Sequence, residues 1–205
     1  MLLLTLGLHL HAAAQVSGPK TVVKLNPLSL FVATANVKVE RRLSTRFSAQ
    51  LGLHLGGPRL KYKADSLPHG IHYFFAGITP EFRYYVAFNR VANPKGLYVG
   101  SFCRFVYARE RYASLATDPD VPGTVSGVAV LKRHVIALGF TVGYQWISKQ
   151  GFTVDLFIGP QYSTSNTKRR MICSTCDGNE RPIGHPGLRF DGIGPRTGLG
   201  LGYAF

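Results

Sequence analysis

From residue 22 onward, large apolar residues alternate with small or polar ones over long stretches of the chain. In the segment 134–146, HVIALGFTVGYQW, every second residue from Ile136 to Trp146 is large, and the residues between them are Ala, Gly, Thr or Gln. The final segment, GLGLGYAF, alternates glycine or alanine with leucine and aromatics. Because successive side chains of a β-strand point to opposite faces, this pattern predicts strands with one bulky apolar face and one small or polar face.

Eight segments of this kind are expected. They are roughly 22–32, 34–44, 46–56, 73–88, 96–110, 132–148, 151–164 and 195–205. Runs of ~10 residues exceed the usual soluble strand of ~5–6 and suit a strand that crosses a bilayer. No run of ~18 apolar residues occurs, so a membrane protein with this sequence would be a β-barrel.

The links between these segments differ in length in a regular way. Short links fall around 42–46, 89–95 and 148–151, and long ones at 57–72, 111–131 and 165–194, with one tight exception near Thr34. Short turns at one rim and long loops at the other are typical of transmembrane barrels, as are aromatics near the strand ends. The sequence therefore predicts an all-β, eight-stranded, antiparallel, up-and-down transmembrane β-barrel with both termini on the short-turn side.

A soluble, lipocalin-like ligand-binding barrel is the structural alternative. It would bury its large residues inward and carry a charged outer face, which the alternation does not provide; charged residues are only 17% of the chain. Pro80 and Pro160 lie inside expected strands, and we expect each to mark a bulge or a rim, because proline cannot donate to a central ladder.

The chain starts with MLLLTLGLHLHAAAQ, an apolar stretch followed by small residues. The A-x-A pattern predicts a signal peptide over 1–14 and a barrel domain over 15–205, although no Lys or Arg precedes the apolar stretch. The net charge of +14 is spread over strands and loops rather than gathered in one stripe. An exported chain with scattered basic residues argues against a nucleic-acid partner and favours an anionic lipid surface.

Charged residues fall on the faces expected to point inward. They are Lys38, Glu40, Arg42, Glu81, Arg83, Arg104 and Asp155. The interior of an eight-stranded barrel is just wide enough to be filled by side chains, so these charges are expected to pair in a network that plugs the barrel. A proton or ion path, or a catalytic carboxylate pair, is the functional alternative, and a wide pore is not expected.

The long links carry further basic residues with a different expected role. They are Arg59, Lys61 and Lys63 in one link, and Lys168, Arg169, Arg170 and Arg181 in another. Such residues are candidates for contacts with the phosphates of outer-leaflet lipopolysaccharide.

Cys173 and Cys176 form a C-x-x-C pair, which in an exported chain suggests a local disulfide. A redox motif or a zinc half-site is a weaker interpretation, because His69 and His72 would have to approach from another loop. No metal and no cofactor are expected.

A lipid-modifying enzyme acting at the barrel rim is the alternative from another functional class. His134 with Ser163 or Ser165 would supply its catalytic groups at the outer ends of two strands. His134 is expected to face lipid, no carboxylate partner is evident and no G-x-S-x-G turn occurs, so catalysis is not expected.

Several stretches together resemble a known group of proteins. They are KLNPLSLFVATANVKVERRLSTRFSAQLGL, ITPEFRYYV, GFTVGYQWISKQGFTVDLFIGP and the last strand ending in Tyr-Ala-Phe. Over roughly 20–205 the chain resembles small outer-membrane β-barrels of Gram-negative bacteria, in particular a domain family of unknown function related to OmpA- and OmpX-like barrels. The family carries no agreed activity. From the strands and loops together we expect a structural or loop-mediated binding role in the bacterial outer membrane, with lipid and lipopolysaccharide as partners. The resemblance implies that Tyr203 and Phe205 are the signal read by the barrel-assembly machinery.

Overall fold

The structure is a computed structural model, and it describes residues 20–31, 33–57, 59–64, 67–86, 94–117, 124–173 and 191–205. Within these ranges, only the backbone is described for 59–71, 112–129 and 169–173. The predicted signal peptide, 1–14, lies outside the described residues.

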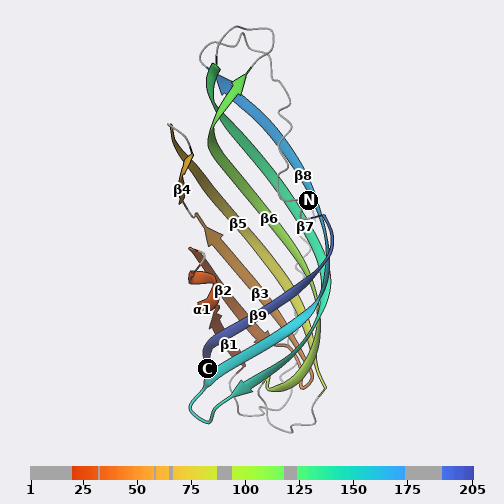
Figure 1. Cartoon of the computed structure of the whole chain (residues 1–205). Helices are drawn as coiled ribbons and strands as arrows, with labels where there is room; N and C mark the ends of the chain where they lie inside the picture. Colours follow the sequence, from red (N-terminus) through yellow and green to blue (C-terminus); the bar gives the residue numbers. More distant parts are fainter. Residues whose placement is uncertain are drawn as a thin grey trace, which may run out of the picture.

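The described chain is an all-β barrel (Figure 1). Its elements are β1 (Thr21–Leu25), α1 (Pro27–Leu30), β2 (Thr34–Arg42), β3 (Phe47–Gly56), β4 (Arg59–Ala64), β5 (Leu67–Tyr85), β6 (Gly96–Thr117), β7 (Thr124–Ile147), β8 (Phe152–Cys173) and β9 (Gly192–Ala204). Neighbouring strands pair antiparallel in chain order, and β1 pairs with β9 to close the sheet. This confirms the prediction of a closed, antiparallel, up-and-down barrel.

The barrel wall has eight strands, although nine segments are extended, because β4 continues β3. Gly56 at the end of β3 pairs with Phe75 of β5, and Arg59 at the start of β4 pairs with His72 of β5. The register is therefore the same on both sides of the interruption. The interruption falls at Gly57-Pro58, where proline cannot contribute an N–H to the ladder.

The first expected strand, 22–32, is too long, because β1 ends at Leu25. Asn26 caps the short helix α1: its side-chain oxygen accepts a hydrogen bond from the backbone N–H of Leu28 at 3.1 Å, and Pro27 begins the helix. Asn at the N-cap and Pro at the first helical position are both favourable for a helix start. No helix in the described part of the chain is long and apolar enough to cross a membrane.

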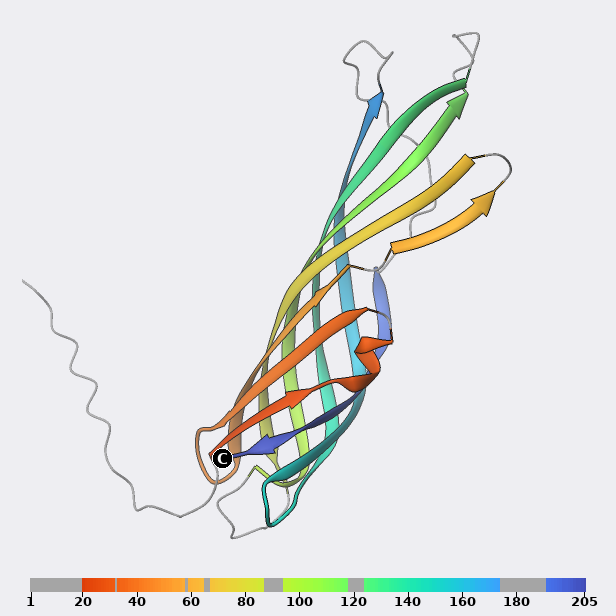
Figure 2. The same ribbon diagram turned by 90° about the vertical axis from the view of Figure 1, so that its left-hand side faces the viewer.

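All three expected long loops are partly wrong, because strands extend into them. β4 and the start of β5 lie within the first of these loops, 57–72. The β6–β7 hairpin remains paired up to Thr117 and Thr124, and β8 continues to Cys173. The strands β5–β8 therefore rise well past β1, β2 and β9, so one side of the barrel is much taller than the other (Figure 2).

Both ends of the described barrel meet at one rim. The backbones of Thr21 and Phe205 exchange two hydrogen bonds, of 3.0 and 2.9 Å. The strand ends that flank the short links 43–46, 86–95 and 148–151 lie at this same rim, in agreement with the predicted alternation of short and long links. We call it the short-turn end, and the opposite rim the long-loop end.

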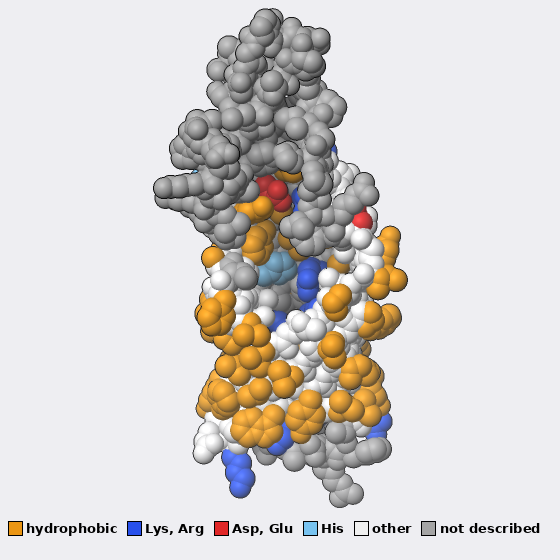
Figure 3. Space-filling view, in the orientation of Figure 1, with side chains coloured by type: hydrophobic (Ala, Val, Ile, Leu, Met, Phe, Trp, Pro, Cys, Tyr) orange, Lys and Arg blue, Asp and Glu red, His pale blue; other side chains and the backbone are white. Residues whose placement is uncertain are grey.

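Large apolar side chains cover the outside of the barrel (Figure 3). On β7, for example, Leu138, Phe140 and Tyr144 are each more than half exposed, whereas the alternate positions Ala137, Thr141, Gly143 and Gln145 are buried. At Pro80 and Pro160 the ladder toward one neighbour is interrupted, but the register is the same before and after each gap. The expected bulges are therefore absent, because the missing proline N–H removes ladder bonds without inserting a residue.

Glycines on the inner face of β9 leave space for the side chains opposite, as the alternation predicts. A Cβ atom at Gly202 would overlap the backbone carbonyl oxygen of Val23 and also crowd Lys24. A Cβ atom at Gly200 would lie 3.4 Å from Asp155 Cβ, an ordinary contact. The two glycines thus differ in how closely the neighbouring strand approaches.

We expect Gly202→Ala to lower the free energy of unfolding by about 1–3 kcal/mol, because the overlapping atom belongs to backbone and cannot rotate away. Gly200→Ala should cost less than about 1 kcal/mol. Denaturant unfolding of the two purified variants measures this difference. Equal losses for both would show that the approach of β1 to β9 does not limit side-chain size there.

Candidate functional site

The most elaborate group of polar side chains lies inside the barrel and is centred on Lys24. Its ammonium donates to Glu40 Oε2 at 2.7 Å, to Gln145 Oε1 at 2.7 Å and to Asp155 Oδ2 at 2.8 Å. These side chains come from four strands, and all four are fully buried. A lysine ammonium has three N–H donors, so Lys24 is completely satisfied.

Arg83 of β5 connects this centre to a third carboxylate. Its Nη1 donates to Asp155 at 2.9 Å, and its Nε donates to Glu81 at 2.7 Å. The other oxygen of Glu81 accepts from Arg196 Nη2 at 2.8 Å. We call the six side chains of Lys24, Glu40, Glu81, Arg83, Asp155 and Arg196 the charge plug.

Neutral hydroxyl groups complete the hydrogen bonding of two carboxylates. Glu40 Oε1 accepts from Ser48 and, at 2.6 Å, from the phenol of Tyr85. Asp155 Oδ1 accepts from the phenol of Tyr98 at 2.7 Å. Burying charge is costly unless each group is paired and hydrogen-bonded, and here both carboxylates use both oxygens.

An apolar layer separates the charge plug from the short-turn end. Val22, Ile147 and Ala204 pack together and are nearly inaccessible. Val22 lies one inward position before Lys24 on β1, and Ile147 one inward position beyond Gln145 on β7, so the layer is closer to that end. Charge pairs and apolar side chains together fill this half of the lumen.

The structure brings together part of the lumen network expected from the sequence. Glu40, Glu81, Arg83 and Asp155 meet in the charge plug. Lys38 and Arg104 also point inward, but they form no ion pair with a carboxylate of the described residues. Arg42 differs from the expectation: it is part-exposed at the short-turn rim and donates from Nε to the Ser44 carbonyl at 2.7 Å, because β2 ends there.

Sequence reasoning missed important members of the charge plug. Lys24 and Arg196 were not singled out, nor were the supporting Gln145, Tyr85 and Tyr98. A signal existed for Arg196: it lies two positions before Gly198 on the same strand, so it shares the inward face with Gly198, Gly200 and Gly202. Lys24 likewise alternates with the inward Val22. The sequence pattern does not show which side chains Lys24 and Arg196 meet across the lumen.

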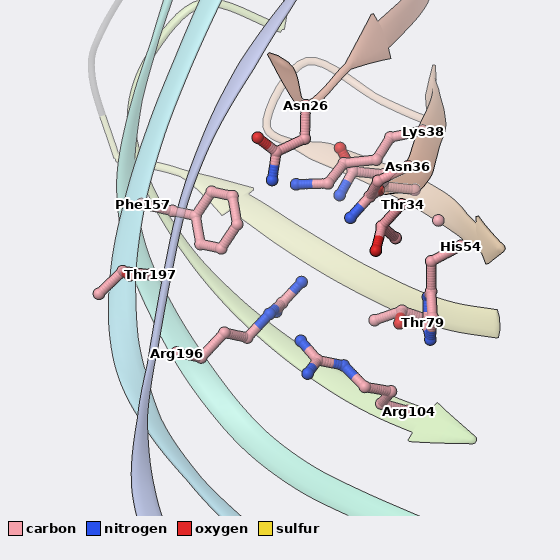
Figure 4. A pocket seen from close by; sticks show the side chains of 12 residues that line it. Asn26, Thr34, Asn36, Lys38, His54, Thr79, Arg104, Phe157, Arg196 and Thr197 are labelled. Carbon is pink, nitrogen blue, oxygen red and sulfur yellow. The ribbon is translucent and has the colours of Figure 1, made fainter. Parts of the chain in front are cut away.

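Above the charge plug, toward the long-loop end, the lumen holds a cavity of about 160 Å³. Lys38, Arg104 and Arg196 extend into it, with Phe157 on one side and His54 and Thr79 on the other (Figure 4). Arg196 belongs to both groups. Each of the other five residues lies nearer the long-loop end than the members of the charge plug on its own or a neighbouring strand. We call this space the lumen cavity.

A second basic group lies on the outside of the barrel. Arg109 of β6 pairs in register with Lys132 of β7, which pairs with Lys168 of β8. All three are outward-facing positions that lie beyond the apolar surface on the long-loop side. We call them the outer basic row. Among the expected lipid-phosphate residues, only Lys168 has a described side chain, and it is exposed.

The remaining expected lipid-phosphate residues are located only by their backbone or not at all. Arg59, Lys61 and Lys63 lie on β4, and Arg169 and Arg170 on β8. Arg181 lies outside the described residues, as does Cys176, so the expected disulfide with Cys173 stays a prediction. In the described part of the chain, no group of three or more His, Cys, Asp or Glu side chains is placed to hold a metal ion.

The candidate groups for a rim enzyme do not converge. His134 points outward and stacks near Tyr107, with 5.2 Å between ring centroids. Ser163 and Ser165 pair with inward positions of β7, and Ser165 Oγ donates to Asp191 Oδ1 at 2.9 Å. The histidine and the serines are thus on opposite faces of the wall. The expectation of no catalysis itself stays a prediction.

Tyr203 and Phe205 project outward at the short-turn end, where both are more than half exposed. Their recognition by an assembly machinery stays a prediction.

Comparisons with known proteins give a family match and a distant structural likeness. Residues 1–182 match the family described as "Protein of unknown function (DUF3575)". No curated protein is significantly similar in sequence. Among solved structures, that of Acinetobacter baumannii CarO has a TM-score of 0.43 and 10% identity, covering 92% of this chain and 98% of that chain. So low a TM-score supports no further inference about this chain.

We expect Lys24→Met to lower the free energy of unfolding by about 3–5 kcal/mol, because Glu40 and Asp155 would remain buried without their shared cation. Denaturant unfolding of the purified barrel measures the loss.

Lys38→Met is the matched control, since Lys38 is just as buried but its ammonium has no hydrogen-bond partner. It should change stability by less than about 1 kcal/mol or increase it, because it removes an unpaired buried charge. A Lys24→Met variant as stable as Lys38→Met would contradict the view that the charge plug holds the barrel together.

Proposed function

Since this chain belongs to the DUF3575 family, whose function is unknown, we propose from its own geometry that it is an integral outer-membrane β-barrel of a bacterium. Its lumen is closed, and it acts as a structural or binding protein that presents the long-loop end to the outside rather than as a channel.

The apolar band on the outer surface carries this proposal. On β8 the outward positions from Phe152 to Tyr162 are apolar, and the next three are Thr164, Asn166 and Lys168. Ten residue steps at about 3.4 Å, tilted by about 40°, span about 26 Å along the barrel axis. This height is close to the ~25 Å apolar band of outer-membrane barrels.

Aromatic residues gather at the short-turn edge of this band. Trp146 and Phe152 pack edge to face with 6.3 Å between centroids, and Phe47 contacts Phe82 and Tyr84 with centroids 5.3 and 5.1 Å apart. Aromatic girdles at the level of the lipid headgroups are typical of outer-membrane barrels. A water-soluble barrel would not expose so many large apolar side chains as a continuous surface.

The closed lumen favours a role other than transport through a wide pore. The charge plug joins side chains from five strands, and the apolar layer lies beneath it. A water-filled channel needs about 16 strands, twice the number here. Opening this lumen would require several buried ion pairs to break together.

The outer basic row supports a contact with lipopolysaccharide phosphates. Like charges directly opposite one another on adjacent strands are destabilising, and three cations from three strands are aligned here. An anion between them would remove this repulsion. The row lies beyond the apolar band on the long-loop side, which is the side where the phosphates of outer-leaflet lipids would lie.

A lipid-modifying rim enzyme is less well supported. Its candidate groups, His134 and Ser163 or Ser165, are on opposite faces of the barrel wall. The soluble, lipocalin-like barrel is disfavoured by the apolar band.

When the full-length protein is expressed in a Gram-negative host, we expect it in the outer-membrane fraction, with different gel mobility before and after boiling. Its single tryptophan, Trp146, should also be quenched by brominated lipids after reconstitution, since it lies outward at the edge of the band. Recovery in the soluble periplasmic fraction, with neither a mobility shift nor lipid quenching, would contradict the proposal.

We expect the triple variant Arg109→Gln, Lys132→Gln, Lys168→Gln to bind lipopolysaccharide about tenfold or more weakly than the parent protein, because each cation near a lipid surface contributes about 1 kcal/mol. Lipopolysaccharide retained per purified barrel, and its binding isotherm, measure the effect.

The matched control neutralises three exposed basic residues at the opposite rim, Lys20, Arg41 and Lys149. It makes the same change in net charge and should leave lipopolysaccharide binding within about twofold. Equal losses in both triple variants would mean that total charge, and not the outer basic row, governs binding.

A further inference from the structure

We infer that the lumen cavity is a binding site for a small soluble oxyanion of the size of phosphate or sulfate, held by Lys38, Arg104 and Arg196. This site shares Arg196 with the charge plug, because Arg196 binds Glu81 through Nη2 only and its Nε and Nη1 have no partner. It is distinct from the outer basic row, and it does not depend on where in the cell the barrel resides.

The first observation is an excess of positive charge within the lumen. Around the charge plug and the lumen cavity, the described inward side chains include five cations, Lys24, Lys38, Arg83, Arg104 and Arg196, and three carboxylates, Glu40, Glu81 and Asp155. All three carboxylates already bind Lys24, Arg83 or Arg196. Lys38 and Arg104 are therefore left without a carboxylate in the described part of the barrel.

The second observation is a set of unpartnered donors around the same cavity. The buried atoms without a hydrogen-bond partner include Lys38 Nζ, Arg104 Nε, and Arg196 Nε and Nη1. Lys38 and Arg196 are only 4% and 6% exposed. Buried polar groups are almost always hydrogen-bonded, so several orphaned cationic donors facing one space point to a missing anionic acceptor.

The third observation is that aromatic rings hold these cations in place. Arg196 Cζ lies 3.8 Å from the centroid of the Phe102 ring, and Arg104 Cζ lies 5.8 Å from it. Lys38 Nζ lies 4.1 Å from the centroid of the Phe157 ring. Cation–π contacts offset part of the desolvation cost but leave the N–H donors free to bind an anion.

The donor set favours an oxyanion over a halide. Guanidinium groups bind oxygen pairs with two parallel N–H bonds, and two guanidiniums and one ammonium converge here from three strands (Figure 4). Neutral groups that can hydrogen-bond further oxygens also line the cavity, among them Asn36, His54 and Thr79. Gln50 also lines the cavity, and its side-chain oxygen Oε1 has no hydrogen-bond partner. A flipped amide would present its NH₂ group there instead.

The size and position of the cavity allow a small ligand to enter. Its 160 Å³ far exceeds the space that one water molecule needs and suits a group of about five heavy atoms with some water. Figure 3 shows basic and histidine side chains in a hollow on the side where the wall is formed by the short strands β1 and β2. The charge plug closes the cavity toward the short-turn end, so the site is a blind pocket.

The test is titration of the full-length barrel, purified in a neutral detergent, with sodium phosphate and with sodium sulfate by isothermal calorimetry. We expect saturable binding of one anion per barrel, with chloride binding at least about tenfold more weakly. Arg104→Gln and Lys38→Met should each weaken phosphate binding by about tenfold or more, because each removes a charged donor. Lys149→Gln, an exposed change at the short-turn rim, should leave binding within about twofold.

A second pair of variants tests the pocket without removing a cation. Gly52 lines the cavity, and a Cβ there would lie 3.7 Å from Lys38 Cγ and 3.6 Å from Thr79 Cβ, so a side chain fits. Gly52→Asp should place a tethered carboxylate beside Lys38, raise resistance to unfolding and reduce phosphate affinity by about tenfold or more. Gly52→Asn has nearly the same shape without the charge and should retain phosphate binding within about threefold.

Folding of every variant is checked by its heat-dependent gel mobility. The proposal is overturned if the folded parent barrel shows no saturable phosphate or sulfate binding. It is equally overturned if folded Lys38→Met and Gly52→Asp bind phosphate as tightly as the parent, since the anion would then lie elsewhere. Equal affinity for chloride would overturn the assignment to oxyanions.

Discussion

The interior of an eight-stranded barrel imposes the constraint on which this molecule depends. The lumen is too narrow for bulk water to solvate charges, yet the inward faces of the strands carry several. Lys24 compensates two of the buried carboxylates, because its ammonium donates one hydrogen bond each to Glu40, Asp155 and Gln145. The glycines of β9 opposite it follow from the same constraint, because they leave the volume that the lysine and its partners occupy.

The two faces of the wall have opposite requirements, and the sequence reflects both. Large apolar residues repeat at every second position of the outer face. Which residues point outward can therefore be predicted from this alternation alone, because it is local along the chain. The number of strands, their order and the rim at which both ends meet were predictable for that reason. The ends of the long strands were not, because the ladders of β6–β8 continue after the alternation stops near Tyr107 and Lys132.

The interior could be predicted only in part, because its contacts are not local. Glu40, Glu81, Arg83 and Asp155 were recognisable as inward charges, but their shared partner Lys24 lies on a five-residue strand followed by a helix. The Asn26-Pro27 pair was an available signal for that helix start. That Lys38 and Arg104 lack carboxylates follows only from distances across the lumen, which no single strand encodes.

Closure of the barrel joins the two ends of the described chain, and this has a consequence for the order of folding. Lys24 and Asp155 are 131 residues apart, and Lys24 and Gln145 are 121 residues apart. Until β1 pairs with β9, Lys24 can reach Glu40 on the adjacent β2 but not Asp155 on β8, and a nearly closed barrel would bury that carboxylate without this cation at a large cost. Contacts so distant in sequence form slowly. The last strand pairing and the neutralisation of the interior are therefore one event, which makes a partly closed barrel electrostatically unfavourable and completion of the barrel cooperative.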